Sequence, residues 1–526
     1  MPPAVCAVDV GTGSARAAVF ASGGDLLGYA ETPVAMHQPA PGWAEHDSEQ
    51  IWRAVVSSVR AATTASAVPA EEIAAIAFDA TCSLVVRGAA GARLPMAEDA
   101  SASWDTIAWL DHRALEEADE ITATRHPALE QVGGTMSPEM QLPKLLWLKR
   151  RRPDIWSRAG YIGDLADFLA FRACGSATRS LSTLTTKWGY APDRDSAWPD
   201  DLLAALGLSD LLERAGIASP PAAVATALGT LGMEAAGAMG LAAACKVGAG
   251  LVDAYAGALG VLGGLPASEL DRSAALIAGT SSCVMHAAAV PRPRRAVWGP
   301  YRDAALQGLW MSEAGQSASG ALLDHVVRLH GLGPSAATHA RIAERVRALR
   351  AAEGDDFASR LHVLPDFHGN RAPFGDPHAL GVVHGLPLDS SFDALCRLYW
   401  RACGGVALGI RQIVDALRAD GCALDALHIA GGHQKNPLLM ELYADALDCR
   451  IVEPRAREPV LLGTAMVAAV AGGIHPDLPA AARAMTRPGR TRTPDRAAKA
   501  AYDRDYAVFL ELHRQRAAID ALIRRG

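Results

Sequence analysis

The stretch Asp9-Val10-Gly11-Thr12-Gly13-Ser14-Ala15-Arg16 lies between two apolar runs, Val5 to Val8 and Ala17 to Phe20. Apolar runs of this length are typical of β-strands, and small residues such as Gly11 and Gly13 suit a tight turn between them. The pattern therefore predicts a β-hairpin with one carboxylate at the end of its first strand.

The turn of this hairpin carries groups that suit a phosphate. Backbone N–H groups and the hydroxyls of Thr12 and Ser14 can approach an anion closely, because the turn residues are small. Asp9 suits a magnesium ion held through water, and Arg16 adds positive charge. No G-x-x-x-x-G-K-[ST] motif occurs, so the hairpin predicts a nucleoside triphosphate site that is not a P-loop. Taken alone, the pattern leaves open that Asp9 merely caps a tight turn.

The composition is that of a globular protein with two domains. The chain has 526 residues, of which 50% are hydrophobic and 20% charged, and this length predicts two domains of roughly 250 residues. Fifty basic and 57 acidic side chains give a net charge of -7, which argues against nonspecific binding to nucleic acid or anionic membranes. The basic clusters Lys149 to Arg152 and Arg292 to Arg295 are interpreted as a helix C-terminus and a solvated loop.

Cysteine usage and the apolar segments favour a cytoplasmic protein. The nine cysteines include no C-x-x-C pair, so we interpret them as reduced core residues. No basic stretch followed by a long apolar core opens the chain, so no signal peptide is predicted. The longest apolar region, Gly237 to Leu265, contains Lys246 and Asp253, which favours a buried α/β core over a membrane span.

Strand-like and helix-like periodicities alternate along the chain, which predicts an α/β protein. Asp47 to Ala62 is predicted as an amphipathic helix capped by its first or second residue, and Ile73 to Phe78 as a buried strand. Further helices are expected around Gly315 to Leu329 and over the charged region Asp495 to Arg525. The last of these would dock on the second domain or on a partner.

A second segment repeats the pattern of the first hairpin. Ala274 to Ala289 predicts strand, turn and strand, and its turn Gly279-Thr280-Ser281-Ser282 offers hydroxyls and N–H groups to another phosphate. Two such hairpins predict two related halves, residues 1–264 and 265–526. The first half would hold the first phosphate loop, and the second half the other one.

A third segment, Gly431-Gly432-His433-Gln434-Lys435-Asn436, lies between a predicted strand and a helix from Pro437 to Leu447. The glycines leave room for a planar ring against the backbone, and Gln434 or Asn436 can hydrogen-bond a nucleobase or ribose. The alternative is an ordinary strand-to-helix turn with Asn436 or Lys435 near the helix cap.

A fourth segment, Gly250 to Gly257, contains a single carboxylate, that of Asp253. An Asp in an apolar, glycine-rich run must find a partner or line a cleft, because burial of a lone carboxylate is costly. A carboxylate in a cleft is what a kinase needs to accept the proton of an attacking hydroxyl. The alternative, Asp253 as the N-cap of the following helix, is compatible with the same position.

These four segments, in this order, resemble the FGGY family of carbohydrate kinases within the actin-like ATPase superfamily. The resemblance covers nearly the whole chain and includes further stretches at Lys144 to Trp147, Glu313 to Ala318, Phe367 to Pro373, Asp376 to Pro377 and Gly463 to Met466. It implies an α/β fold of two ribonuclease-H-like domains that face a central cleft. The sugar would bind deep between the domains, and ATP would enter from the other side.

The resemblance also implies roles for single residues, with ATP and Mg2+ as cofactors. Asp253 matches the catalytic base, and both Asp9 and Asp253 match carboxylates near the magnesium ion. The remaining matches are the first phosphate loop at Gly11, Thr12, Gly13, Ser14 and Arg16, the second at Gly279, Thr280 and Ser281, and the adenosine site at Gly431, Gly432, Gln434 and Asn436.

The sugar pocket is expected around Phe78 to Val86, where the run Thr81-Cys82-Ser83-Leu84-Val85 resembles the signature of the D-ribulose kinase branch. Lys187 and Glu313 resemble the Lys and Glu with which ribulokinases hold the sugar. A ketopentose offers a carbonyl and hydroxyls to such a donor and acceptor.

Two further candidate sugar contacts are Trp109 and Asp111. Without the family, Trp109 is interpreted as a core residue, Asp111 as the partner of Arg113, Cys82 as a small buried residue, and Lys187 as a surface lysine.

The sequence thus predicts an ATP- and magnesium-dependent kinase that converts D-ribulose to D-ribulose 5-phosphate. The alternative substrates are L-ribulose, D-xylulose or a pentitol such as ribitol, and a more remote alternative is a non-kinase actin-like ATPase. The expected partners are a sugar and ATP, without nucleic acid or membrane. Because many relatives are dimers, a homodimer is left open.

Overall fold

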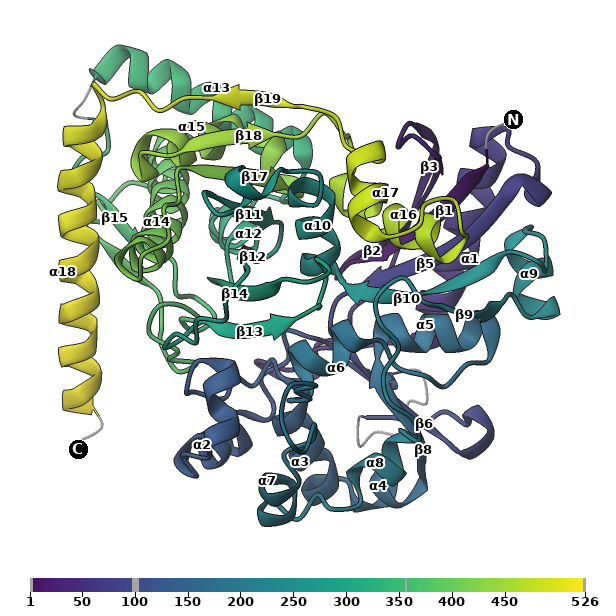
Figure 1. The fold of residues 1–526 in the computed structure, drawn as a ribbon. Helices are drawn as coiled ribbons and strands as arrows, with labels where there is room; N and C mark the ends of the chain where they lie inside the picture. The colour runs from purple at the N-terminus through teal and green to yellow at the C-terminus, as the bar shows by residue number, and fades with distance from the viewer. Residues whose placement is uncertain (1–2, 97–103, 355–356, 524–526) are drawn as a thin grey trace. The chain divides into compact units, whose positions relative to one another are not determined.

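The structure is a computed structural model that describes residues 3–96, 104–354 and 357–523. It divides into two compact units, whose elements Figure 1 labels. The first unit comprises Met1–Pro266, Ala287–Ser312 and Ala456–Arg487, and the second comprises Ala267–His286, Glu313–Arg455 and Pro488–Gly526. The division into residues 1–264 and 265–526 stays a prediction about folding domains, and the two late segments of the first unit are not part of it.

The first unit is built on a six-stranded sheet with the order β3-β2-β1-β5-β10-β9. The strands are β1 (Ala4–Val10), β2 (Ser14–Ala21), β3 (Leu26–Pro33), β5 (Ile73–Ala80), β9 (Ala227–Thr230) and β10 (Lys246–Val252). β1, β2 and β3 pair antiparallel, β1, β5 and β10 run parallel, and β9 is antiparallel to β10. The predicted hairpin is confirmed, and Asp9 pairs with Arg16 across it.

Helices cover both faces of this sheet. α1 (Ser48–Ser66) and α5 (Leu165–Cys174) share one hydrophobic core with Cys6, Val8 and Val247. α10 (Asp253–Leu262) and α16 (Pro459–Ala471) pack on each other, and α16 contacts β1, β5 and β10. The predicted helix after Asp47 is confirmed as α1, because the Asp47 carboxylate caps it by accepting the N–H groups of Glu49 and Gln50 at 2.9 and 3.1 Å.

Shorter elements complete the first unit. A four-stranded sheet has the order β4-β7-β6-β8, with β4 (Glu45–His46), β6 (Leu84–Gly88), β7 (Thr106–Ile107) and β8 (Ala159–Asp164). The remaining helices are α2 (Leu115–Ala123), α3 (Gln141–Arg151), α4 (Pro153–Arg158), α6 (Leu181–Lys187), α7 (Asp200–Ala205), α8 (Leu211–Ala215), α9 (Met233–Met239) and α17 (Leu478–Met485). The basic cluster at Lys149 to Arg152 forms the C-terminus of α3, as predicted.

The second unit repeats the architecture of the first. Its strands belong to a seven-stranded sheet with the order β13-β14-β12-β11-β17-β18-β19. The bounds are β11 (Ser273–Ala278), β12 (Ser282–Ala288), β13 (Trp298–Arg302), β14 (Trp310–Gln316), β17 (Ala426–Ala430), β18 (Arg450–Glu453) and β19 (Arg490–Arg492). β11 pairs antiparallel with β12 and parallel with β17, β17 is parallel to β18, and β19 is antiparallel to β18.

The other elements of the second unit are a hairpin of β15 (His362–Leu364) and β16 (Val382–His384), and helices α11 (Ala267–Leu270), α12 (Gly320–Leu329), α13 (Ala336–Glu353), α14 (Phe392–Ala419), α15 (Pro437–Leu447) and α18 (Lys499–Ile523). The expected helix start at Gly315 is wrong, because Gly315 lies on β14 and the helix begins at Gly320. A Cβ at Gly315 would lie 2.2 Å from the carbonyl oxygen of Ser282, so the glycine allows two strands to approach closely.

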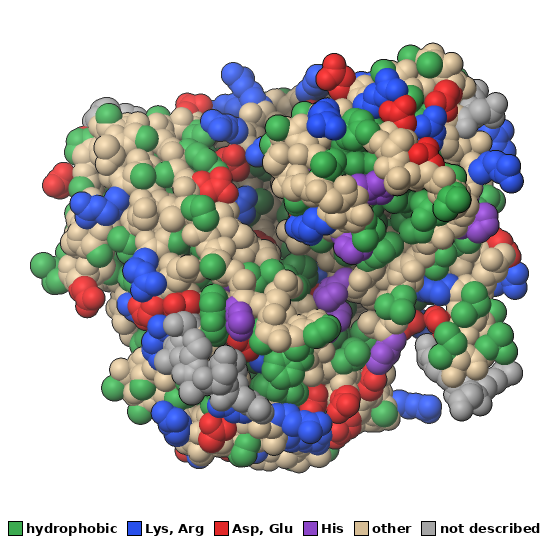
Figure 2. Space-filling view, turned by 180° about the vertical axis from the view of Figure 1, so that it is seen from behind, with side chains coloured by type: hydrophobic (Ala, Val, Ile, Leu, Met, Phe, Trp, Pro, Cys, Tyr) green, Lys and Arg blue, Asp and Glu red, His purple; other side chains and the backbone are tan. Residues whose placement is uncertain are grey.

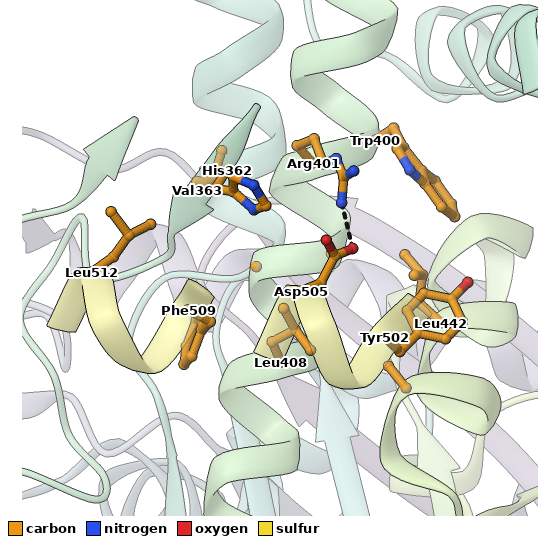
Figure 3. Close-up of a pocket in the computed structure, with 13 residues that line it drawn as sticks. His362, Val363, Trp400, Arg401, Leu408, Leu442, Tyr502, Asp505, Phe509 and Leu512 are labelled. Carbon is orange, nitrogen blue, oxygen red and sulfur yellow. Dashed lines mark hydrogen bonds and ion pairs between the residues drawn. The ribbon is translucent and has the colours of Figure 1, made fainter. Parts of the chain in front are cut away.

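The C-terminal helix α18 docks on its own unit. Asp505 forms an ion pair with Arg401 of α14 at 2.5 Å, and Phe509 is buried (Figure 3). A pocket lies beside these contacts, lined by residues of β15, α14, α15 and α18 such as His362 and Leu442. The structure thus matches docking on the second domain over the described part of the predicted helix, which ends before residues 524–526.

Among the described residues, no helix is long and apolar enough to cross a membrane. All nine cysteines lie in described segments, and all are free thiols. On the face drawn in Figure 2, acidic and basic side chains of the described residues are interspersed.

Candidate functional site

Three carboxylates gather at one edge of the first sheet. Asp9 near the end of β1 is in register with Asp79 of β5, and Asp253 follows directly after the last residue of β10. Because β1, β5 and β10 run parallel, their carboxyl ends meet at the same edge of the sheet. Asp9 and Asp253 were predicted as site residues, whereas Asp79 was not.

The Asp9 and Asp79 carboxyls are both buried and influence each other. Arg16 Nη2 lies 2.7 Å from Asp9 Oδ2, and Thr464 of α16 donates its hydroxyl to Asp79 Oδ2. Burial raises the pKa of Asp9 although the charge of Arg16 opposes this. Burial, followed by the charge of Asp9, holds the pKa of Asp79 well above its usual range. A hydrogen bond with Asp79 lowers the pKa of Asp9 in part.

Asp253 is the first residue of α10, after the cap residue Val252. Its Oδ1 accepts the N–H of Ala254 at 2.7 Å, and its charge contributes to the raised pKa of Asp79. The alternative interpretation of Asp253 as N-cap is therefore off by one residue. A carboxylate in the first turn of a helix is stabilised by the helix dipole.

The glycine turn of the first hairpin is open on its outer side. The N–H of Gly11 donates to the carbonyl of Ser14 at 3.0 Å and closes the turn. A Cβ at Gly13 would meet no atom within 4 Å. Such space beside backbone N–H groups is what a phosphate group requires.

Trp109 connects this turn to the predicted sugar segment. Its indole Nε1–H donates to Thr12 Oγ1 at 3.0 Å, and its backbone N–H donates to Ser83 Oγ at 3.2 Å. Ser83 Oγ is hydrogen-bonded in turn to Thr81 Oγ1 at 3.0 Å. Between them, Cys82 is buried, and burial raises the pKa of its thiol to about 12. Thr81, Cys82, Ser83 and Trp109 are thus brought together beside the predicted first phosphate turn.

Asp111, the other candidate sugar contact on this loop, already has partners within the protein. It forms an ion pair with Arg113 at 2.8 Å and accepts the N–H of Ala44 at 2.6 Å. Arg113 itself lies against the rings of Trp43 and Trp147, at 4.2 and 5.0 Å from their centres. The pair with Arg113, which was the alternative interpretation, is present in the structure, and the role of Asp111 as a sugar contact stays a prediction.

Lys187 is the last residue of α6 and is only 4% exposed. Its Nζ lies 4.6 Å from the centre of the Trp298 ring. It lines a pocket of the first unit together with residues such as Thr186, Met140 and Tyr301. The interpretation of Lys187 as a surface lysine is therefore wrong.

The turn Gly279 to Ser281 of the second unit packs on the start of α12. The N–H of Gly279 donates to the carbonyl of Ser281 at 2.8 Å, and the N–H of Gly320 donates to the carbonyl of Gly279 at 3.1 Å. The carbonyl of Thr280 accepts the N–H groups of Ser319 and Ala321. A Cβ at Gly279 would meet nothing within 4 Å, so this turn is also open on one side.

The segment Gly431 to Asn436 lies beside this second turn. Gly431 has φ +95°, and a Cβ there would lie 2.5 Å from the carbonyl oxygen of Ala278, whereas a Cβ at Gly432 would meet nothing within 4 Å. Asn436 caps α15 by accepting the N–H of Leu438 at 3.1 Å, and its amide donates to Tyr399 Oη at 3.1 Å. The amide of Gln434 donates to the carbonyl of Ile429. The capping role considered as the alternative for Asn436 is thus present.

Glu313 belongs to a buried cluster of the second unit. Its Oε1 lies 3.3 Å from Arg371 Nη1 and accepts the thiol of Cys283 at 3.5 Å. Arg371 Nη1 also lies 3.2 Å from Cys283 Sγ. Lys187 and Glu313, which were predicted to hold the sugar together, therefore belong to different units.

Among the described residues, no three or more His, Cys, Asp or Glu side chains form a cluster that could hold a metal ion by themselves. The first unit instead offers Asp9 beside Arg16, next to an open glycine turn. A magnesium ion at Asp9 would need further ligands from a bound phosphate or from water.

Comparison with known proteins places this arrangement in a family. Models of the N-terminal and C-terminal domains of the FGGY family of carbohydrate kinases match residues 4–260 and 274–472. The chain belongs to the FGGY family of carbohydrate kinases. It is therefore a carbohydrate kinase, and members of this family use ATP.

Individual FGGY relatives agree with this assignment. An FGGY carbohydrate kinase domain-containing protein of Danio rerio is 40% identical over 530 residues, which cover 96% of each chain. A D-ribulokinase of Saccharomyces cerevisiae is 33% identical over 88% of this chain and 71% of its own. The crystal structure of a xylulose kinase from Rhodospirillum rubrum, at 23% identity, superimposes with a TM-score of 0.77 over 98% of this chain and 99% of its own, which supports the two-domain, actin-like α/β fold.

Asp79 and Lys144 are buried polar residues that were not among the predicted site residues. Asp79 lies two residues before Thr81, and Lys144 opens one of the stretches that carry the resemblance. A carboxylate at the end of a buried strand is a signal for Asp79, the same one that selected Asp9. No local pattern marks Lys144, because its partners lie more than thirty residues away.

Proposed function

We propose that this kinase phosphorylates a ketopentose and that its substrate is D-ribulose. The observation that carries the proposal is the gathering of Asp253, Asp9 and the Thr81 to Ser83 segment on adjoining parts of the first sheet. Support for D-ribulose comes from the similarity to a D-ribulokinase at 33% identity. The resemblance of Thr81-Cys82-Ser83 to that branch points the same way.

The reaction proposed is an in-line phosphoryl transfer. The terminal C5 hydroxyl of the sugar attacks the γ-phosphorus, a new C5–O–P bond forms, and the bond to the β–γ bridging oxygen breaks to release ADP. Asp253 accepts the proton of the attacking hydroxyl. Its position at the start of α10 fixes the carboxylate, because Oδ1 is held by the N–H of Ala254.

ATP and magnesium fit the residues present. The turns at Gly13 and Gly279 and the backbone at Gly432 all have open space where a side chain would stand, so phosphates and a planar base can approach the main chain. Asp9 presents a buried carboxylate beside the open glycine turn, and we assign it to magnesium. When bound, the metal ion neutralises charge on the β- and γ-phosphates.

We propose two separate candidate sugar contacts, Lys187 within the first unit and Glu313 within the second. Lys187 is a buried cation over an aromatic ring, and Glu313 is held by Arg371. A donor and an acceptor of this kind suit a carbonyl and hydroxyls. Asp111 is not included, because its oxygens already bind Arg113 and Ala44.

A coupled ADP-release assay with magnesium ATP tests the proposal on a panel of D-ribulose, L-ribulose, D-xylulose and ribitol. We expect the highest kcat/KM for D-ribulose. A preference for another member of the panel would contradict D-ribulose while leaving Asp253 as base. ATP turnover that no sugar stimulates would contradict the proposed pentulose specificity altogether.

A further inference from the structure

Trp109 is fixed at three points by groups of the first unit. Its indole N–H donates to the hydroxyl of Thr12, and its backbone N–H donates to Ser83 Oγ. Its backbone carbonyl accepts a hydrogen bond from Lys144 Nζ at 3.0 Å. These three bonds tie the indole ring and the backbone of Trp109 to separate segments of the first unit.

These bonds belong to a closed ring. From Trp109 the ring runs through Ser83 Oγ to Thr81 Oγ1. The backbone N–H of Thr81 donates to the carbonyl of Val10 at 3.0 Å, and Val10 is two residues before Thr12 on the same hairpin. The ring thus joins the first phosphate turn to the predicted sugar segment through side chains and backbone.

Lys144 holds the ring from behind. Its side chain is 0% exposed, and its Nζ donates to the carbonyls of both Ala108 and Trp109 at 3.0 Å. Burial lowers the pKa of Lys144, and more distant carboxylates such as Asp111 and Glu139 oppose this. No ion pair of Lys144 occurs among the described residues. Its buried ammonium group donates hydrogen bonds to two consecutive backbone carbonyls instead. Such burial costs free energy that an apolar side chain would avoid.

We propose that Trp109 is a positioning residue that couples sugar binding to nucleotide binding, and that Lys144 keeps it in place. A phosphate at Thr12 orients the indole, and the indole orients Ser83 and Thr81. By linkage, a sugar at Thr81 to Ser83 must then raise the affinity for nucleotide by the same factor by which nucleotide raises the affinity for sugar. This coupling rests on the proposed function for the roles of the two segments.

The link between nucleotide binding and Trp109 is tested without any sugar. In protein labelled with 15N at the tryptophan indoles, the Trp109 resonance is assigned by its absence from Trp109→Phe. We expect this resonance to shift when a non-hydrolysable ATP analogue and magnesium are added. In Thr12→Val the shift is lost, and in Thr12→Ser, which keeps the hydroxyl acceptor, it is retained. If the chemical shift of the Trp109 indole in the unaltered protein does not change when nucleotide is added, the proposal is overturned.

The sugar half is tested by calorimetry of the same ATP analogue, with and without the sugar that the pentose panel selects. We expect the sugar to tighten nucleotide binding at least about fivefold, the lower end of usual couplings. Trp109→Phe and Thr12→Val reduce this factor to near one, and Lys144→Met reduces it in part. Thermal unfolding confirms that each variant is folded.

Matched controls remove the same groups elsewhere in the first unit. Trp156→Phe removes an indole N–H that donates to Asp210, and Lys149→Met removes a lysine of the same helix as Lys144. Both should keep the full coupling factor. An unchanged factor in Trp109→Phe overturns the coupling. A panel that selects no sugar contradicts the proposed function, and an indole shift seen in that case still supports the link between Thr12 and Trp109.

Discussion

The two units place different chemistry on the same sheet. In both, an antiparallel hairpin is followed by two strands parallel to its first strand and by an antiparallel edge strand. Each hairpin turn begins with a glycine, Gly11 in the first unit and Gly279 in the second. The order and direction of the strands around the two turns are therefore the same, although the Gly11 N–H donates to Ser14 and the Gly279 N–H to Ser281.

The side chains at the strand ends differ. Two residues before the turn glycine stands Asp9 in the first unit and Ile277 in the second, and their parallel partners are Asp79 and Ala430. The first sheet edge carries buried charge, whereas the second carries apolar residues beside open glycines. The same strand topology thus occurs twice, and a few strand-end residues decide which sheet edge carries ionisable groups.

The sharpest test of this comparison is Asp253→Asn in the first unit. We expect kcat to fall by about 10²- to 10⁴-fold, the usual contribution of a general base, while nucleotide affinity is kept. The coupled assay measures the rate, and calorimetry measures nucleotide binding. Asp201→Asn, at an exposed Asp that pairs with His126, is the control. Near-normal turnover in a folded Asp253→Asn protein would remove Asp253 as the base.

The second test makes the first sheet edge resemble the second, through Asp79→Asn in magnesium-free buffer. The pKa of Asp79 is raised in the folded protein, chiefly by burial. Below its unfolded value of 3.8 the carboxyl is protonated in both states and contributes nothing. As pH rises further, the unfolded chain ionises freely while the folded carboxyl resists, so stability is lost.

Asparagine has no proton to lose, and it keeps an acceptor for Thr464. We therefore expect Asp79→Asn to stabilise the protein at pH 8, on the order of a few kcal/mol, the usual net cost of a buried charge, and to do little at pH 4. Denaturant unfolding at the two pH values measures this. A gain of equal size at both would contradict the raised pKa.

The third test compares the two turns directly, with Thr12→Val and Thr280→Val. Thr12 accepts the indole N–H of Trp109, so its loss leaves a largely buried donor unpaired at a cost of roughly 1–3 kcal/mol. Thr280 is exposed, and its variant should unfold at nearly the normal denaturant concentration. Equal destabilisation by both substitutions would show that the indole bond contributes nothing.

The smallest expected effect belongs to the second unit, in Asn436→Ala. Loss of the cap on α15 should cost about 1 kcal/mol. Ser391→Ala removes a comparable cap from α14 and should cost a similar amount. Only Asn436→Ala should also weaken nucleotide binding, because Asn436 lies at the proposed adenosine site. Equal nucleotide affinity in both variants would restrict Asn436 to its capping role.

Local sequence predicted what local physics determines. The glycine turn between Val10 and Ser14, the cap at Asp47 and the strand-to-helix turn at Gly431 depend on neighbouring residues, and the structure contains all of them. The ion pair of Asp111 with Arg113 could also be predicted, because the two residues are close in sequence. The order of the four segments along the chain predicted the FGGY family.

Contacts between segments that are distant in the sequence could not be predicted from local patterns. The burial of Lys187 depends on Trp298, and the position of Trp109 depends on Thr12. Gly315 was assigned to a helix because nothing near it in sequence reveals how closely the backbone of Ser282 approaches. Packing across the sheet decides these positions, and it leaves no periodic signal in one chain.

The return of α16 to the first unit has a consequence for biosynthesis. α16 covers β1, β5 and β10, and its Thr464 reaches an aspartate on β5 that lies 385 residues earlier in the chain. While the ribosome is still translating the segment Glu313–Arg455, the sheet nearest the N-terminus lacks the helix for one of its faces. The ribosome makes the first segment of this unit at the start of synthesis and its last segment, Ala456–Arg487, near the end. Folding of the first unit must therefore wait until most of the chain has been made.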